Sequence, residues 1–205
     1  MAKRSVTILD HRINNLANIV NAFKVLGVDV RVAERPEQLR DAGHVVLPGV
    51  GAFGASMDAL EAKGLDEALR QHVAAGKPLL GICLGYQVLF DRGNEGGGRA
   101  GLGFIPGYSK RFERGLPIPH VGWNRVQIVR EHPATAGMRN TTYVYFTHSY
   151  HTADVPDENV LVCADYGGNF VCGAAKDTVV GVQFHPETSG ASGLRLLLHY
   201  VDWRP

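Results

Sequence analysis

Cysteine is scarce in this chain, and neither sign of charge dominates. Its 205 residues include three cysteines, Cys83, Cys163 and Cys172, and their spacing matches no disulfide framework. Such a small, odd set argues against a secreted domain held together by disulfides. The formal net charge is +1, which gives no reason to expect binding to nucleic acid or to an anionic membrane surface.

Long apolar runs are also missing. No stretch has the length of a membrane span, and the apolar run after the basic N-terminal residues is too short for a signal peptide. The glycine-rich stretch 93–99 lacks the Gly-Lys-Ser/Thr ending of a phosphate loop, so we expect a flexible surface loop. Cys163 and Cys172 lie in apolar runs and are expected in the core. A metal site would need further ligands at short spacing from them, so none is predicted. We therefore expect a protein of the reducing cytoplasm.

The first half of the chain alternates strand and helix patterns. Strands are predicted at 6–9, 28–32, 45–47 and 78–82, and helices at 14–26, 36–41, 55–63 and 65–75. Short β-rich runs follow at 125–130, 143–147, 160–165, 170–175 and 179–184, before a last helix at 191–201. We predict a single α/β domain over residues 1–205, with a mostly parallel sheet flanked by helices. Additional antiparallel strands and a smaller sheet are expected in the C-terminal half.

The segment Gly81-Ile82-Cys83-Leu84-Gly85 joins the fourth predicted strand to residues 86–90, which have a helical look. It is the cysteine form of the G-x-S-x-G nucleophile elbow. The two glycines permit a sharp turn, and a helix beginning at Leu84 would direct its positive end at the sulfur, which favours thiolate. The pattern leaves two interpretations open, a nucleophile or a buried cysteine in a strand-to-helix joint.

A cysteine nucleophile needs a base, and the base needs a group that orients it. His185 ends an apolar run, and Glu187 follows two residues later. In an extended chain these two side chains face the same side, so the carboxylate can hold the imidazole. By itself, His-Pro-Glu is also an ordinary polar strand end.

Two further features fit a nucleophile. Gln87 lies one helical turn beyond Cys83, where its amide can reach a bound substrate. The stretch 48–51 follows a neighbouring strand and can supply one backbone N–H, with that of Leu84 as the second, to a tetrahedral oxyanion.

Taken together, Gly81-Ile82-Cys83-Leu84-Gly85-x-Gln87 and His185-Pro186-Glu187 resemble the class I (triad) glutamine amidotransferases. Segments that resemble, more narrowly, the glutaminase subunits of imidazole glycerol phosphate synthases cover nearly the whole chain: 47–54, 101–107, 119–124, 146–150 and 183–190. The resemblance implies a flavodoxin-like sheet and a catalytic triad of Cys83, His185 and Glu187. It also implies no cofactor, an oxyanion site at Val50 and Leu84, and a glutamine site formed by Gly49, Gly51, Gln87, His148, Ser149 and Tyr150.

The resemblance further implies a partner. In that family, ammonia passes to a (β/α)8-barrel cyclase, which forms imidazole glycerol phosphate and an aminoimidazole carboxamide ribotide in histidine biosynthesis. Two departures fall in regions that lie near the partner in the family: residues 10–16 lack the family's two glycines and tyrosine, and Thr188 replaces a lysine. Changes at a docking surface favour a different partner, so a paralogue that supplies a sugar amidotransferase of surface polysaccharide synthesis stays open. A catalytically silent regulatory subunit and a cysteine peptidase or esterase are further alternatives.

Overall fold

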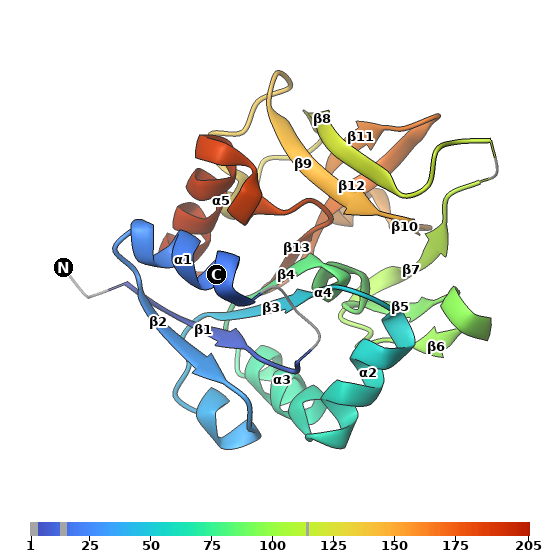
Figure 1. The fold of residues 1–205 in the computed structure, drawn as a ribbon. Coiled ribbons are helices and arrows are strands. Elements are labelled where there is room, and N and C mark those ends of the chain that lie inside the picture. The colour runs from blue at the N-terminus through green and yellow to red at the C-terminus, as the bar shows by residue number, and fades with distance from the viewer. Residues whose placement is uncertain (1–3, 13–15, 114) are drawn as a thin grey trace.

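The computed structural model describes residues 4–12, 16–113 and 115–205. A continuous sheet runs through it, and the first part of that sheet is parallel (Figure 1). Its strand order is β2-β1-β3-β4-β13, the flavodoxin-like order. The bounds are β1 Ser5–Leu9, β2 Asp29–Ala33, β3 Val45–Gly49, β4 Leu79–Cys83 and β13 Val179–Val182. The predicted α/β class and parallel arrangement are therefore confirmed.

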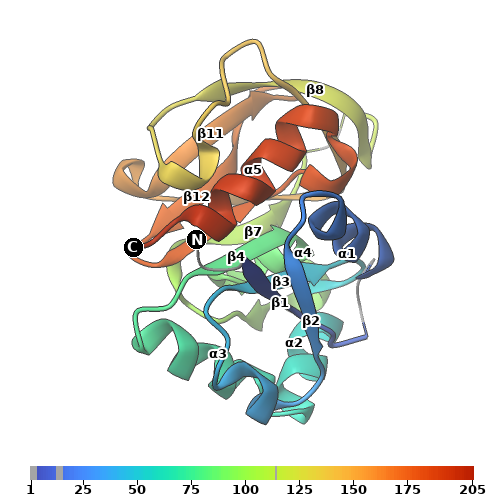
Figure 2. The same ribbon diagram turned by 90° about the vertical axis from the view of Figure 1, so that its left-hand side faces the viewer.

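Helices cover both faces of the parallel strands, because alternate strand residues are apolar on opposite sides. Ile8, Val46 and Ile82 pack in one cluster with residues of α1 (Leu16–Val25) and α5 (Gly190–Asp202). The neighbouring positions Leu9, Leu47 and others pack in a second cluster with α2 (Phe53–Ala62) and α3 (Leu65–Ala74). Figures 1 and 2 show these helix pairs on opposite sides of the sheet. The predicted helices 55–63, 65–75 and 191–201 are thus confirmed, and the part of 14–26 that lies outside residues 13–15 is helical as expected.

The C-terminal half extends the sheet with mainly antiparallel strands, as predicted, but the smaller sheet expected beside it is a branch of the same sheet. From β13 the path continues through β12, β10, β7, β5 and β6, and a branch leads from β12 through β11 and β8 to β9. Four of these strands, β5, β6, β7 and β10, were not predicted, since they are short or carry charged residues without clear alternation. The bounds are β5 Phe90–Gly93, β6 Arg99–Ala100, β7 Ile105–Arg111, β8 His120–Ile128, β9 Tyr143–His148, β10 Tyr150–Ala153, β11 Val160–Asp165 and β12 Asn169–Lys176.

The predicted helix after the elbow is much shorter than expected. Helix α4 spans only Leu84–Gln87, and the chain is back in a strand at Phe90. The carbonyls of Val88 and Leu89 accept hydrogen bonds from residues 102, 104 and 105 rather than from a following helical turn. All of residues 86–90 are buried, so their apolar character does not distinguish helix from strand. A single turn also leaves a weaker dipole at the sulfur than the sequence suggested.

Other short elements are 3-10 turns. The predicted helix 36–41 is η1 (Pro36–Leu39), and the glycine-rich stretch 93–99 contains η2 (Glu95–Gly97). That stretch lies at the surface as expected, but Arg99 forms ion pairs of 2.8 and 2.7 Å with Asp58 and Glu61 on α2. The remaining turns are η3 Pro133–Thr135, η4 Asp157–Asn159 and η5 Pro186–Thr188.

The two cysteines assigned to the core are buried there. Cys163 is 5% exposed and Cys172 fully buried, and burial raises the pKa of both thiols. Among the described residues, no helix combines the length and apolar character that crossing a membrane requires.

Close backbone approach requires glycine at the joint between β3, β4 and α4. A Cβ atom on Gly85 would overlap the carbonyl oxygen of Leu47, and one on Gly81 would lie 2.7 Å from the carbonyl oxygen of Gly85. These contacts draw the chain after β4 tightly against β3, so the elbow glycines predicted from the sequence have a steric cause.

We expect Gly85→Ala to lower the free energy of unfolding by about 3 kcal/mol, because the methyl group meets rigid backbone. Urea unfolding followed by circular dichroism measures the change. Gly54→Ala is the matched control, since nothing lies within 4 Å of a Cβ there and alanine stabilises a helix by up to about 1 kcal/mol. Equal effects of the two substitutions would contradict the steric argument.

Candidate active site

Cys83 lies at the carboxyl end of β4, in a backbone conformation that L-residues rarely adopt. Its φ is 57° and its ψ is −111°, so the turn is strained in the way expected of a nucleophile elbow. The residue is 6% exposed. Leu84 is the first helical residue after it, and the N–H of a first helical residue has no carbonyl one turn earlier to bond. This joint places the sulfur and a free donor side by side.

The carboxyl ends of the two neighbouring parallel strands bring the other predicted groups to the same edge. Gly49 ends β3 opposite Cys83 in register, and Val50 and Gly51 follow it. On the other side β13 pairs with β4, and the chain beyond it leads to His185. In doubly wound sheets this edge is where ligands bind.

His185 and Glu187 are paired as predicted, although the local backbone differs from the prediction. Pro186–Thr188 form a 3-10 turn rather than an extended strand end, and Nδ1 of His185 still lies 2.8 Å from Oε1 of Glu187. The Glu187 side chain is 1% exposed. A proton on Nδ1 is therefore held by a buried carboxylate, which turns Nε2 away from Glu187.

A backbone clamp fixes the position of His185. Its N–H donates to the carbonyl of Tyr145 at 3.0 Å, and the hydroxyl of Ser189 donates to the carbonyl of His185 at 2.6 Å. The N–H of Tyr145 donates to the same hydroxyl at 2.9 Å. Strand β9 and the start of α5 thus hold the imidazole between them.

The charge on His185 is set by opposing effects. Burial lowers its pKa, but the proximity of Cys83 and the hydrogen bond and charge of Glu187 outweigh burial and raise the pKa to about 10. Nε2 has no hydrogen-bond partner of normal length in the described part of the chain, as is common for catalytic pairs without substrate. The arrangement favours an imidazolium at His185 beside the sulfur of Cys83.

A cleft of about 300 Å³ opens onto these groups. Nearly all of the residues predicted for the site line this cleft. Gly49 and Glu187 do not line it. Sequence reasoning missed Glu95, Pro119 and Thr147; a carboxylate in a glycine-rich stretch gives no sign of where the stretch folds. The lining residues are Val50, Gly51, Cys83, Leu84, Gln87, Glu95, Pro119, Thr147, His148, Ser149, Tyr150 and His185.

His148 lines the cleft, but its ring is occupied by other protein groups. Nδ1 lies 2.8 Å from the carbonyl oxygen of Tyr150, which only accepts, so Nδ1 carries the proton. Nε2 then accepts from Nδ1 of His120 at 2.9 Å. Burial, the largest cause, lowers the pKa of His148 to about 3 and that of His120 to about 4. This neutral pair supports the cleft wall, and both nitrogens of His148 are already used.

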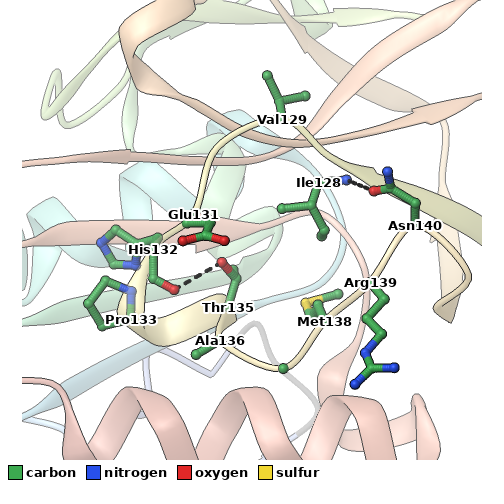
Figure 3. Close-up of a pocket in the computed structure, with 11 residues that line it drawn as sticks. Ile128, Val129, Glu131, His132, Pro133, Thr135, Ala136, Met138, Arg139 and Asn140 are labelled. Atoms are coloured by element: carbon green, nitrogen blue, oxygen red, sulfur yellow. Dashed lines mark hydrogen bonds between the residues drawn. The ribbon is translucent and has the colours of Figure 1, made fainter.

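A larger cavity lies elsewhere, away from the predicted site. It has a volume of about 720 Å³ and is lined by the segment between β8 and β9 (Figure 3). Within this segment the N–H of Ile128 donates to Oδ1 of Asn140 at 2.7 Å. None of the predicted site residues lines it. No group of three or more His, Cys, Asp or Glu suited to a metal is found among the described residues.

The two departures from the family pattern have structural roles here. His11 is 1% exposed, and its Nε2 lies 3.1 Å from the hydroxyl of Ser56 on α2. Arg12 has a φ of 70°, and its N–H donates to Oδ1 of Asp10 at 2.8 Å. Residues 13–15 lie outside the described residues. Thr188 is exposed in the turn after His185, and its hydroxyl donates to the His185 carbonyl at 3.3 Å.

The model of the family described as glutamine amidotransferase class-I matches residues 7–198. The chain belongs to that family. Two curated relatives of this amidotransferase are named imidazole glycerol phosphate synthase subunit HisH. The one from Symbiobacterium thermophilum is 43% identical over 195 residues, covering 95% of this chain and 92% of the relative. The one from Streptococcus gordonii is 44% identical over 198 residues, covering 96% and 95%.

Solved structures agree with the amidotransferase fold. PurLQS from Thermotoga maritima superposes with a TM-score of 0.79 at 18% identity, covering 98% of each chain. A crystal structure described as glutamine amidotransferase gives a TM-score of 0.77 at 18% identity, covering 96% of this chain and 97% of the other.

Buried neutral histidines make this amidotransferase sensitive to acid. Burial lowers the pKa of His11 and of His120 to about 4 and that of His148 to about 3. Below pH 6.5 the unfolded chain binds protons at these positions and the folded chain does not. The free energy of unfolding therefore decreases as the pH is lowered. The expected loss is about 1.4 kcal/mol per histidine for each pH unit between 6.5 and the folded pKa.

Urea unfolding at pH 7.0, 6.0 and 5.0 measures this loss. His11→Gln keeps a polar partner for Ser56 and removes one titrating group. The slope of its free energy of unfolding against pH should therefore be smaller, by the contribution of one histidine. The same slope in the variant and the parent would contradict the assignment.

Proposed function

We propose that Cys83, His185 and Glu187 hydrolyse glutamine to glutamate and ammonia, and that the chain is the glutaminase subunit of an imidazole glycerol phosphate synthase. The observation that carries this proposal is the strained cysteine at the end of β4 facing a cleft that it shares with a carboxylate-held histidine. Family membership and relatives at more than 40% identity support it.

The reaction follows from the roles of these groups. The Cys83 thiolate attacks the side-chain amide carbon of glutamine, and the oxyanion that forms is held by the N–H groups of Val50 and Leu84. The His185 imidazolium gives its Nε2 proton to the leaving nitrogen, so ammonia departs and a thioester remains. Neutral His185 then takes a proton from water, which attacks the thioester to release glutamate and regenerate the thiolate.

The cleft suits a small amino acid. Its volume is about 300 Å³, at the small end of ligand pockets. Glu95 puts a carboxylate in its wall, which is complementary to an α-ammonium group; Oε2 of that carboxylate accepts from the N–H of Phe53 at 2.7 Å. Gln87 donates at 3.0 Å to Tyr150 and at 2.9 Å to Gln183, so its free oxygen is the atom left to accept from the substrate. Gly49, Gly51, Ser149 and Tyr150 complete the proposed glutamine site.

The relatives' names favour histidine biosynthesis over the sugar amidotransferase alternative, because both are subunits of imidazole glycerol phosphate synthase. In this proposal a (β/α)8-barrel cyclase receives the ammonia. The presence of all three triad residues argues against a silent regulatory subunit. The small cleft with its polar lining suits glutamine, which argues against a peptidase or esterase.

Exposed apolar residues at the cleft rim support a docked partner. Val50 lines the cleft and is 37% exposed. Val121 is 56% exposed and lies opposite Thr147, another cleft residue, in the β8–β9 pair. Trp123, two residues further along β8, is 57% exposed. Apolar side chains gathered around a reactive cleft are typical of an interaction surface.

Cys83→Ala should abolish glutamine hydrolysis, because it removes the nucleophile; the loss should exceed about 1,000-fold. Glutamate release measures it, with circular dichroism to establish that the variant folds. Labelling by a glutamine-analogue electrophile should modify Cys83 of the parent protein, and Cys163→Ala serves as the matched control that keeps activity. Full activity of Cys83→Ala would disprove the proposed mechanism.

Val121→Asp should reduce the stimulation of glutamine hydrolysis by the cyclase subunit from the same host at least about tenfold, because it places a charge in the proposed interface. Val129→Asp is the matched control, since Val129 is also 56% exposed but lies beside the distant 720 Å³ cavity. Titration of each variant with the cyclase measures the effect. Equal stimulation of both variants would argue against this surface.

A further inference from the structure

Gln183 lies next to Cys83 for a reason set by the sheet register. Strands β13 and β4 are parallel, with Gly181 opposite Gly81 and Val182 opposite Ile82. The next residue on each chain is therefore Gln183 on one side and Cys83 on the other. Gln183 is fully buried, and its backbone N–H donates to the carbonyl of Cys172 at 2.9 Å. Its side chain has no route to solvent and must satisfy its amide within the site.

The orientation of two side-chain amides can be worked out from one backbone carbonyl. The Tyr150 carbonyl only accepts hydrogen bonds, so the Gln87 atom that lies 3.0 Å from it is the nitrogen. The same nitrogen lies 2.9 Å from the Gln183 side chain, and the Gln183 atom facing it must then be the oxygen. The nitrogen of Gln183 is left to face the sulfur of Cys83, at 3.8 Å.

The Tyr150 carbonyl, at which this series of hydrogen bonds begins, is itself held in place. The Tyr150 carbonyl accepts a second hydrogen bond, at 2.8 Å, from Nδ1 of His148. His148 in turn accepts from His120, so a neutral histidine pair holds the carbonyl in place. An amide N–H aimed at sulfur stabilises the thiolate more than the thiol, because a hydrogen bond to a charged acceptor is the stronger one.

We propose that Gln183, oriented by Gln87, is a thiolate-stabilising residue of the active site, which donates a hydrogen bond to Cys83 from outside the lining of the substrate cleft. Gln183 does not line that cleft. The inference rests on the proposed glutaminase mechanism and assigns a residue outside the Cys83, His185 and Glu187 triad. Gln87 thereby has two tasks, accepting from the substrate and fixing the neighbouring amide.

Other charges near the sulfur must stay constant in a test. The groups that face it are His185, with Glu187 behind it, and Glu95 across the cleft. His148 lies in the same wall but stays neutral above about pH 5, since burial lowers its pKa to about 3. Substituting Gln183 leaves all four groups unchanged.

The test measures the alkylation rate of Cys83 by iodoacetamide between pH 5 and 9, located by peptide mass spectrometry, in the full chain. Gln183→Met keeps the shape and removes the donor. Gln183→Glu keeps the shape and places a carboxylate beside the sulfur. We expect alkylation at pH 6 to fall about tenfold in the Met variant and further in the Glu variant, with the midpoint of each profile moving to higher pH and kcat/KM for glutamine falling in the same order.

Asn159→Asp is the matched control. Asn159 is a buried amide that donates to the Ala175 carbonyl at 3.0 Å and does not line the cleft. Its variant should lose stability without moving the alkylation profile. Unchanged profiles in folded Gln183→Met and Gln183→Glu would overturn the inference while leaving glutamine hydrolysis by the parent protein intact. A parent protein that neither hydrolyses glutamine nor shows enhanced alkylation at pH 6 would instead disprove the proposed function.

Discussion

The register of three parallel strands determines the site. Strands β3, β4 and β13 lie side by side, so their carboxyl ends deliver the Gly49 loop, Cys83 and the segment to His185 to one edge. The Gly85 backbone packs directly on the Leu47 carbonyl, which leaves room for no side chain and locks β3 against the elbow. A shift by one residue in either pairing would separate the sulfur from both its base and its oxyanion donors.

Much of this arrangement could be predicted because local sequence and long-range pattern agree. Gly81 and Gly85 reveal a sharp turn, and alternating apolar residues reveal the strands that lead to it. The contact between His185 and Glu187 was predicted correctly from a wrong premise, since a 3-10 turn rather than an extended strand joins them. Two residues of separation bring these side chains together in either conformation.

What could not be predicted depends on distant contacts. Residues 86–90 are apolar in either a helix or a strand, and hydrogen bonds from residues 102–105 decide where the helix stops. Glu95 reaches the cleft only because its turn folds back onto α2, where it binds the Phe53 N–H. Gln183 appeared in a motif but had no assigned role, because its direction follows from Gln87 and the Tyr150 carbonyl, both remote in sequence.

The left-handed backbone at Cys83 has a consequence for inactivation. A residue with a side chain at a φ of 57° carries a conformational cost of about 1–3 kcal/mol, and only the packing of β3, α4 and β13 around it prevents relaxation. Because these elements include central strands of the sheet, conditions that loosen this packing release the elbow and open the sheet around it. Activity therefore reports whether the centre of the sheet is intact, whereas circular dichroism averages over the whole chain.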